Sequence, residues 1–237
     1  MSANHHLAFI LDSPMQAWGA SSRFTRRDTL PHPTKSGVLG MIAAAMGIDK
    51  FADDEAEKLA PLKSLRLNTY AIPKLDRWEK NLPVGRLQDF HTIGGGYSKK
   101  NILHVPKRAR GTHNLNTVIT RRDYLTDARF LVILSGEKET LNQIQTALQK
   151  PIWGTWLGRK CCIPSTPIQP VIDENIKAAA HTILERTGTK PCALESYDRY
   201  LEEDSPESFL QMDQPEAYAC RHYSSRPVKH LLANQKE

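Results

Sequence analysis

A long interruption in the hydrophobic pattern constrains the fold of this chain more than any other sequence feature. Between Pro83 and Phe130 the sequence is poor in apolar side chains and is broken by several glycines and a proline. A loop of such length without secondary structure is uncommon inside a compact domain. The short runs at residues 89–93 and 117–120 therefore predict the two strands of a protruding hairpin.

The interruption also carries the positive charge of the chain. The 237 residues include 32 Lys and Arg against 26 Asp and Glu, a net charge of +6. From Arg86 to Arg129 there are nine basic and three acidic residues, which account for the whole net charge. Residues 195–216, in contrast, hold eight carboxylates and one arginine. This separation predicts that the hairpin meets a polyanion such as a nucleic acid.

Apolar periodicity on both sides of the interruption predicts alternating strands and helices. Residues 6–11 and 130–134 are continuous apolar runs typical of buried strands, and residues 65–71 alternate as a half-buried strand does. A helix with one apolar face is predicted from Val38 to Met46, with Thr34 or Ser36 as N-cap and Gly47 as its end. Two more helices are predicted at residues 137–150 and 174–186, with extended chain between them at residues 165–172.

This order, strand-helix-strand followed by strand-helix-strand, predicts an α+β fold of the ferredoxin-like or RRM-like type. Residues 1–85 and 125–172 are expected to form its palm, residues 86–124 an inserted hairpin, and residues 173–237 a small C-terminal extension. No apolar stretch is long enough to span a membrane and no signal peptide is evident, so a cytoplasmic protein is expected. Four cysteines without CxxC spacing predict free thiols and no zinc.

Candidate anion contacts gather before the first predicted helix. Thr34, Lys35, Ser36 and the amide of Gly37 converge at the helix start, where they either bind a phosphate or form an ordinary cap. The sequence is not a nucleotide-binding P-loop, because GxxxxGK[ST] is absent. Trp18 and Phe24 either stack on unpaired bases beside nearby arginines or, for Trp18, pack in the core.

Two further stretches have both a functional and a structural interpretation. Arg159 and Lys160 follow a glycine-rich turn that either contacts the nucleic-acid backbone or fastens the last strand to the sheet. His91, His104 and His113 suit a metal-independent ribonuclease, but their spacing fixes no acid–base pair, and they equally suit an RNA-facing hairpin. Residues 53–55 are expected in a solvated loop rather than in a two-metal site. No catalytic residue, metal or cofactor is predicted.

A series of short motifs runs in order along residues 7–170. They are residues 13–19 (SPMQAWG), 26–29 (RRDT), 33–40 (PTKSGVLG), 89–92 (DFHT), 120–125 (TRRDYL) and 157–160 (LGRK) ahead of Cys162 and Pro164. No single motif is specific, but their joint order resembles the CasD family, a subunit of the type I-E CRISPR surveillance complex Cascade. The similarity weakens beyond residue 173.

This resemblance implies a non-catalytic subunit that caps Cascade by holding the 5′ handle of the CRISPR RNA. It implies that a thumb hairpin wedges against the guide, with the Cascade backbone and large subunits as partners and the target DNA nearby. Two alternative functions remain open. They are a metal-independent endoribonuclease that processes CRISPR repeat RNA, and a protein-only scaffold whose basic hairpin binds an acidic subunit. The residues expected to contact RNA are Gln16, Trp18, Arg23, Arg26, Arg27, Thr34, Lys35, Ser36, Gly37, His91, Lys99, Lys100, Lys107, Arg108, Arg110, Arg121, Arg122, Arg159 and Lys160.

Overall fold

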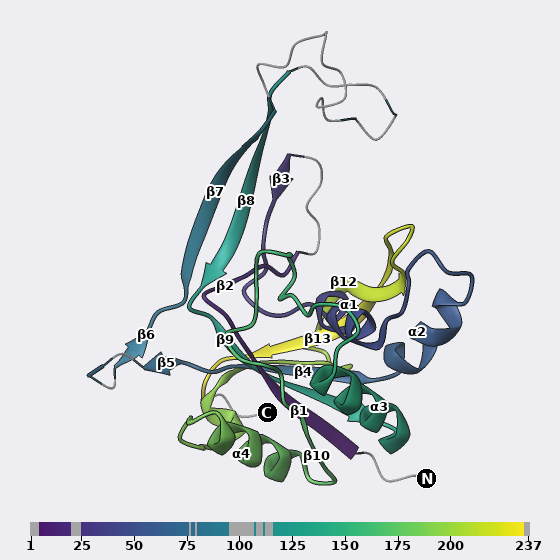
Figure 1. Cartoon of the computed structure of the whole chain (residues 1–237). Coiled ribbons are helices and arrows are strands. Elements are labelled where there is room, and N and C mark those ends of the chain that lie inside the picture. Colours follow the sequence, from purple (N-terminus) through teal and green to yellow (C-terminus); the bar gives the residue numbers. More distant parts are fainter. Residues whose placement is uncertain are drawn as a thin grey trace.

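The computed structural model describes residues 5–19, 25–75, 77–78, 80–94, 107, 111 and 116–234. Its main sheet has seven strands, and all neighbouring strands are antiparallel (Figure 1). In order across the sheet they are β10 (Val171–Asp173), β1 (His5–Asp12), β9 (Arg129–Gly136), β4 (Arg66–Ala71), β11 (Asp198–Leu201), β13 (His222–Leu231) and β12 (Phe209–Ala217). The predicted α+β class is confirmed.

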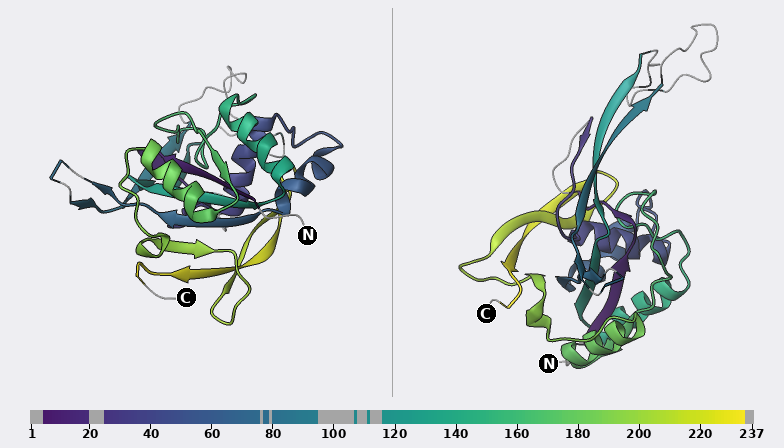
Figure 2. Two further views of the ribbon diagram at one scale, coloured as in Figure 1. Left: turned by 90° about the horizontal axis from the view of Figure 1, so that it is seen from below. Right: turned by 90° about the vertical axis from the view of Figure 1, so that its left-hand side faces the viewer.

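Helices cover both faces of this sheet. α1 (Lys35–Met46) and α3 (Lys138–Gln149) pack on the face that receives Leu7 and Phe9 of β1. α4 (Ile176–Arg186) packs on the other face, which receives Ala8 of β1 and Ile133 of β9 (Figure 2). Because successive strand residues point to opposite faces, both faces of β1 and β9 are buried, as predicted for residues 6–11 and 130–134. None of the helices in the described ranges combines the length and hydropathy that a membrane crossing requires.

A separate sheet forms the protruding hairpin. β7 (Gly85–Ile93) pairs antiparallel with β8 (Val118–Thr126) along its whole length. β2 (Met15–Gln16) and β3 (Arg26–Arg27) pair with the other edge of β8. Figures 1 and 2 show the hairpin rising away from the main sheet and its helices. Both predicted hairpin strands are confirmed, and both are longer than the apolar runs that indicated them. A small second hairpin, β5 (Lys74–Leu75) with β6 (Asn81–Leu82), lies at its base.

The first helix begins and ends where the sequence predicts. Thr34 is the N-cap, and its Oγ1 accepts the N–H of Gly37 at 3.2 Å. Gly47 ends α1 with φ 72°, a left-handed conformation that glycine adopts without steric cost. Local signals therefore determine both ends of this element.

The C-terminal residues contribute a large part of the main sheet. Residues 173–237, expected as a small extension, supply α4, the short helix η2 (Leu194–Ser196) and the strands β11, β12 and β13. β12 lies against α1 and α2, and two register irregularities interrupt its pairing with β13. These irregularities break the period-two pattern, which is why the sequence did not indicate this strand.

The helix α2 (Glu55–Lys63) was not predicted, since Pro61 and many charged side chains obscure its pattern. Glu55 is 7% exposed, and its Oε1 accepts the backbone N–H of Tyr218 at 2.9 Å. The expectation of a solvated loop at residues 53–55 is therefore wrong for Glu55, whereas Asp53 and Asp54 are exposed.

Candidate nucleic-acid interface

Two arginine clusters that are far apart in the sequence lie on adjacent strands. β3 pairs in parallel with β8, which places Arg26 beside Arg121 and Arg27 beside Arg122. Residues paired across strands point to the same face, so like charges lie next to each other. Such an arrangement costs stability in isolation and is typical of a surface that binds a polyanion.

One face of the hairpin combines Arg26 and Arg121 with an aromatic ring. Phe90 of β7 is paired with Arg121, and the Arg121 guanidinium lies 5.8 Å from the centre of the Phe90 ring. Phe90 is 58% exposed, and Arg26 and Arg121 are exposed as well. Arg26 also forms an ion pair with Asp28 at 3.2 Å. An exposed ring beside a guanidinium group can stack on a base while the cations meet phosphates.

A pocket of about 360 Å³ lies at the foot of the hairpin, and we call it the cation pocket. Ser36 and Gly37 at the start of α1 form one wall, and both are partly exposed. Arg27, Arg159 and Arg221 bring positive charge to it from three separate segments, against the single carboxylate of Asp28. The pocket is therefore suited to an anion.

Arg159 is held in place by neutral groups. Its Nη1 donates to the carbonyl of Asp123 at 3.0 Å and its Nη2 to the carbonyl of Arg27 at 2.8 Å. The guanidinium also lies 4.5 Å from the centre of the Tyr124 ring. Because these carbonyl partners carry no net charge, the positive charge of Arg159 is not neutralised by them.

The turn that precedes Arg159 requires glycine. Gly158 has φ 92°, and a Cβ atom there would overlap the carbonyl oxygen of Ala17. The neighbouring residue Leu157 accepts the N–H of Ala17 at 3.1 Å, so this turn is fastened to the N-terminal segment. The turn therefore both fastens the chain and carries Arg159, and the two interpretations of this stretch do not exclude each other.

Two residues expected to contact RNA are part of the core instead. Trp18 and Gln16 are both 0% exposed. Trp18 Nε1 donates to Gln16 Oε1 at 3.0 Å, and Gln16 Nε2 donates to the carbonyls of Leu11 and Ala128 at 3.2 and 2.8 Å. Neither side chain can stack on a base or reach a phosphate without unfolding this segment. The prediction for Gln16 is therefore wrong, and of the two interpretations of Trp18 the structure shows packing in the core.

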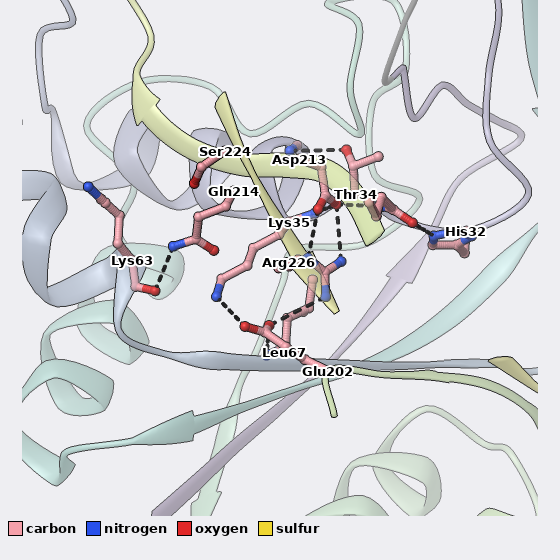
Figure 3. A network of polar contacts seen from close by, with 12 residues as sticks. His32, Thr34, Lys35, Lys63, Leu67, Glu202, Asp213, Gln214, Ser224 and Arg226 are labelled. Atoms are coloured by element: carbon pink, nitrogen blue, oxygen red, sulfur yellow. Dashed lines mark hydrogen bonds and ion pairs between the residues drawn. The ribbon is translucent and has the colours of Figure 1, made fainter. Parts of the chain in front are cut away.

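The start of α1 is occupied by carboxylates of the chain itself (Figure 3). Lys35 is 2% exposed, and its Nζ lies 2.8 Å from Glu202 Oε1. Its backbone N–H donates to Asp213 Oδ2 at 2.6 Å, and Asp213 also pairs with Arg226 at 2.7 Å. The prediction that Lys35 is an exposed cation at an anion site is therefore wrong. Thr34 is also buried, at 1% exposed, with its hydroxyl used as the cap.

Burial governs the ionisation of this network. Desolvation lowers the pKa of Lys35, while the adjacent Glu202 carboxylate opposes that effect. Desolvation also lowers the pKa of His32 to about 4. His32 Nε2 lies 2.9 Å from Gln211 Oε1, and its ring stacks on Tyr200 with centroids 3.8 Å apart. The C-terminal strands thus fasten α1 through buried polar contacts rather than leaving its N-terminus open.

The other residues predicted to contact RNA are either exposed on the surface or lie outside the described ranges. His91 is exposed on β7 with its Nδ1 3.6 Å from Asp89, Lys107 is exposed, and the Lys160 ammonium lies 5.5 Å from the Trp156 ring. The predicted residues that lie outside the described ranges are Arg23, Phe24, Lys99, Lys100, His104, Arg108, Arg110 and His113.

Three pocket residues come from the part of the chain that sequence patterns described least well. Met212, Arg221 and Tyr223 belong to β12, β13 and the turn between them, and they close one side of the cation pocket. No local motif marks them, because only the packing of β12 and β13 over α1 brings them to Arg27.

Within the described ranges, no three His, Cys, Asp or Glu side chains gather as a metal site would require. The four cysteines carry free thiols.

Comparisons with known proteins agree in placing this chain among CRISPR-associated proteins. A family model described as CRISPR-associated protein (Cas_Cas5) matches residues 6–229. The CRISPR system Cascade subunit CasD of Escherichia coli (strain K12) is 30% identical over 166 residues, which are 69% of this chain and 69% of that protein.

Solved structures give the same result. A chain of a CRISPR RNA-guided surveillance complex has a TM-score of 0.67 at 27% identity, with 96% of this chain and 90% of that chain covered. A crystal structure of a Cas protein has a TM-score of 0.62 at 29% identity, with 96% and 94% covered. The resemblance indicated by the motif order is confirmed. Since the family model extends from β1 into β13 and so includes the hairpin and the C-terminal strands, the chain belongs to the CRISPR-associated Cas5 family.

Proposed function

We propose that this chain is a subunit of a type I-E Cascade complex that holds the 5′ handle of the CRISPR RNA in the cytoplasm without cutting it. The observation that carries the proposal is the pairing of β3 with β8. It places Arg26 beside Arg121 on one face of the hairpin sheet, and Arg27, which lines the cation pocket, beside Arg122 on the other face. Like charges paired directly across two strands cost stability, so such pairs are expected where a polyanion binds and offsets that cost.

The palm that presents this surface is ferredoxin-like, or RRM-like. In support, the strand order β10-β1-β9-β4 with α1 and α3 on one face follows from two βαβ units joined through the hairpin. Residues 86–124 act as the thumb, and residues 173–237 complete the sheet and cover the start of α1. RNA recognition by such a fold uses an exposed surface rather than an enclosed cavity.

The partners of this subunit are the CRISPR RNA, the backbone and large subunits of Cascade, and target DNA near the guide. The relative from Escherichia coli is named as a Cascade subunit, and a structural neighbour comes from an RNA-guided surveillance complex. Exposed apolar side chains on the hairpin, Leu87, Ile93 and Ile119, suit protein contacts beside the RNA.

A holding role rather than a cutting role is supported by the surroundings of His91. This histidine is exposed, and its Nδ1 lies 3.6 Å from Asp89 of the same strand, an arrangement typical of a solvated surface contact. General acid–base catalysis requires two groups in a defined mutual geometry around the reacting atoms.

The test is RNA affinity at several salt concentrations for the full chain and for the double variant Arg26→Ala/Arg121→Ala. Loss of two phosphate contacts should lower the affinity and reduce the slope of log affinity against log salt by about 1.5 for a single strand. The matched control is Arg186→Ala/Lys190→Ala, which also removes two exposed cations. Arg186 ends α4 and Lys190 follows it, on the face of the main sheet opposite to α1. An unchanged slope in the first variant contradicts the proposal, and site-specific cutting of repeat RNA by the isolated chain favours an endoribonuclease.

A further inference from the structure

A second pocket, of about 550 Å³, continues from the cation pocket along α1. Ser36, Gly37, Gly158, Arg221 and Tyr223 line both, so the two spaces form one continuous surface. The far part differs in chemistry from the cation pocket because it is lined by aromatic rings. These rings belong to Phe51, Trp153, Trp156, Tyr218 and Tyr223, and we call this space the aromatic groove.

Backbone hydrogen bonds hold the chain segments that carry the two tryptophans of the groove. Trp153 N donates to the carbonyl of Ala44 at 3.2 Å, at the end of α1. The carbonyl of Trp156 accepts the N–H of Gly158 at 2.9 Å, within the turn that is fastened to Ala17. A Cβ atom on Gly154 would lie 2.7 Å from the Trp156 ring, so this ring packs closely over a glycine backbone. A ring packed as the Trp156 ring is loses little conformational entropy when a flat ligand stacks on it.

The edge of the groove is positively charged. The Lys160 ammonium lies 5.5 Å from the Trp156 ring centre, and the Lys50 ammonium lies 4.8 Å from the Phe51 ring centre. Together with Arg221, these cations outnumber the single lining carboxylate, Asp49. Trp153 is 45% exposed and Phe51 is 75% exposed, so flat faces and cations are accessible together. Aromatic faces beside cations favour a ligand that is both flat and anionic, which describes unpaired nucleotides better than an apolar protein segment.

We propose that the aromatic groove stacks unpaired bases of the same RNA strand whose phosphates occupy the cation pocket. This inference rests on the proposed function, since it needs an RNA in the cation pocket. The shared wall at Gly37 and Arg221 lets one strand pass from the phosphate site to the stacking site without leaving the surface. Stacking of this kind tolerates any base sequence, because every base presents a flat π-face.

The experiment compares two probes that have the same phosphates. One is single-stranded oligoadenylate, and the other is an oligomer of equal length in which every ribose is abasic. The affinity of the full chain for each is measured at several salt concentrations. We expect the two salt slopes to agree, because they report phosphate contacts, and the oligoadenylate to bind on the order of tenfold tighter.

Variants locate the effect. Trp153→Ala and Trp156→Ala should each reduce the preference for the oligoadenylate, and Trp156→Phe should retain most of it. Trp78→Ala is the matched control, since Trp78 is 64% exposed but lies on the turn between β5 and β6. Thermal melting identifies any variant that loses its fold. If Trp156→Ala does not fold, the preference for oligoadenylate is compared in Trp156→Phe and Trp153→Ala instead.

Three results overturn the inference. Equal affinity for both probes with a normal salt slope shows that bases do not enter the groove, as expected if side chains of a protein partner fill it, while the proposed function stands. A preference that persists in both Trp153→Ala and Trp156→Ala places the bases elsewhere. Salt-independent binding of both probes contradicts the proposed function, and the inference fails with it.

Discussion

Lys35 and Arg159 both lie near the start of α1, but they have different partners. These partners determine whether each positive charge is balanced within the protein or remains able to attract an anion. The Lys35 ammonium lies 2.8 Å from Glu202, so its charge is balanced inside the protein. The Arg159 guanidinium donates to two carbonyl oxygens, which orient it but leave its net charge in place. A buried balanced cation serves the fold, whereas a cation oriented by neutral groups remains able to attract a phosphate.

Replacement of Lys35 should therefore change stability rather than RNA affinity. Lys35→Ala leaves the partly buried Glu202 without its closest cation, and breaking such a pair costs about 3 kcal/mol of the free energy of unfolding. Urea denaturation measures this loss. The contrasting variant is Lys160→Ala, which removes an exposed cation and should alter the free energy of unfolding by less than about 0.5 kcal/mol while it weakens RNA binding. A stable Lys35→Ala variant with reduced RNA affinity would contradict this assignment.

The environment of Lys35 could not have been predicted from its neighbours in sequence. Its carboxylate partners are separated from it by 167 and 178 positions, in a segment whose strands are irregular. The elements with local signals were predicted correctly, because Thr34 and Gly47 mark the ends of α1 and continuous apolar runs mark β1 and β9. Pairing of β3 with β8 depends on tertiary structure, so the sequence indicated both groups of arginines but not that they pair across adjacent strands.

The turn at Gly158 is the element whose geometry depends most on one residue. Gly158→Ala introduces a Cβ atom that would overlap the Ala17 carbonyl, at a backbone conformation that already disfavours other residues. We expect a loss of about 3 kcal/mol or more, together with weaker RNA binding, because displacement of the turn moves Arg159.

A matched control separates backbone strain from the clash. Gly188 also has a positive φ, 67°, but a Cβ atom there meets nothing within 4 Å. Gly188→Ala should cost only about 1 kcal/mol, the usual penalty for a left-handed residue with a side chain. Chemical denaturation of both variants gives the comparison. Equal losses at the two positions would show that the contact with Ala17 does not constrain the turn.

At the scale of the whole molecule, the protein consists of a core that determines stability and a projecting hairpin that carries charge. The two clusters of buried hydrophobic residues lie on opposite faces of the main sheet, and Ile93, at the far end of β7, belongs to neither. Phe90 and Ile119 of the hairpin are exposed. Folding and RNA binding are therefore expected to depend on different residues.

Replacement of residues 94–116 by a short glycine-containing turn tests this separation. The paired strands β7 and β8 remain, with Ile93 opposite Val118, so a tight turn can close them. Loop-closure free energy changes by only about 0.6 kcal/mol per doubling of length, so the free energy of unfolding should stay within about 1 kcal/mol of its original value. The deleted segment contains Lys99, Lys100, Lys107, Arg108 and Arg110 and no acidic residue, so its loss should abolish co-purification with guide RNA and the other Cascade subunits. A variant that aggregates would show that the segment supports the core, and one that still assembles on RNA would show that β3, β8 and the cation pocket suffice.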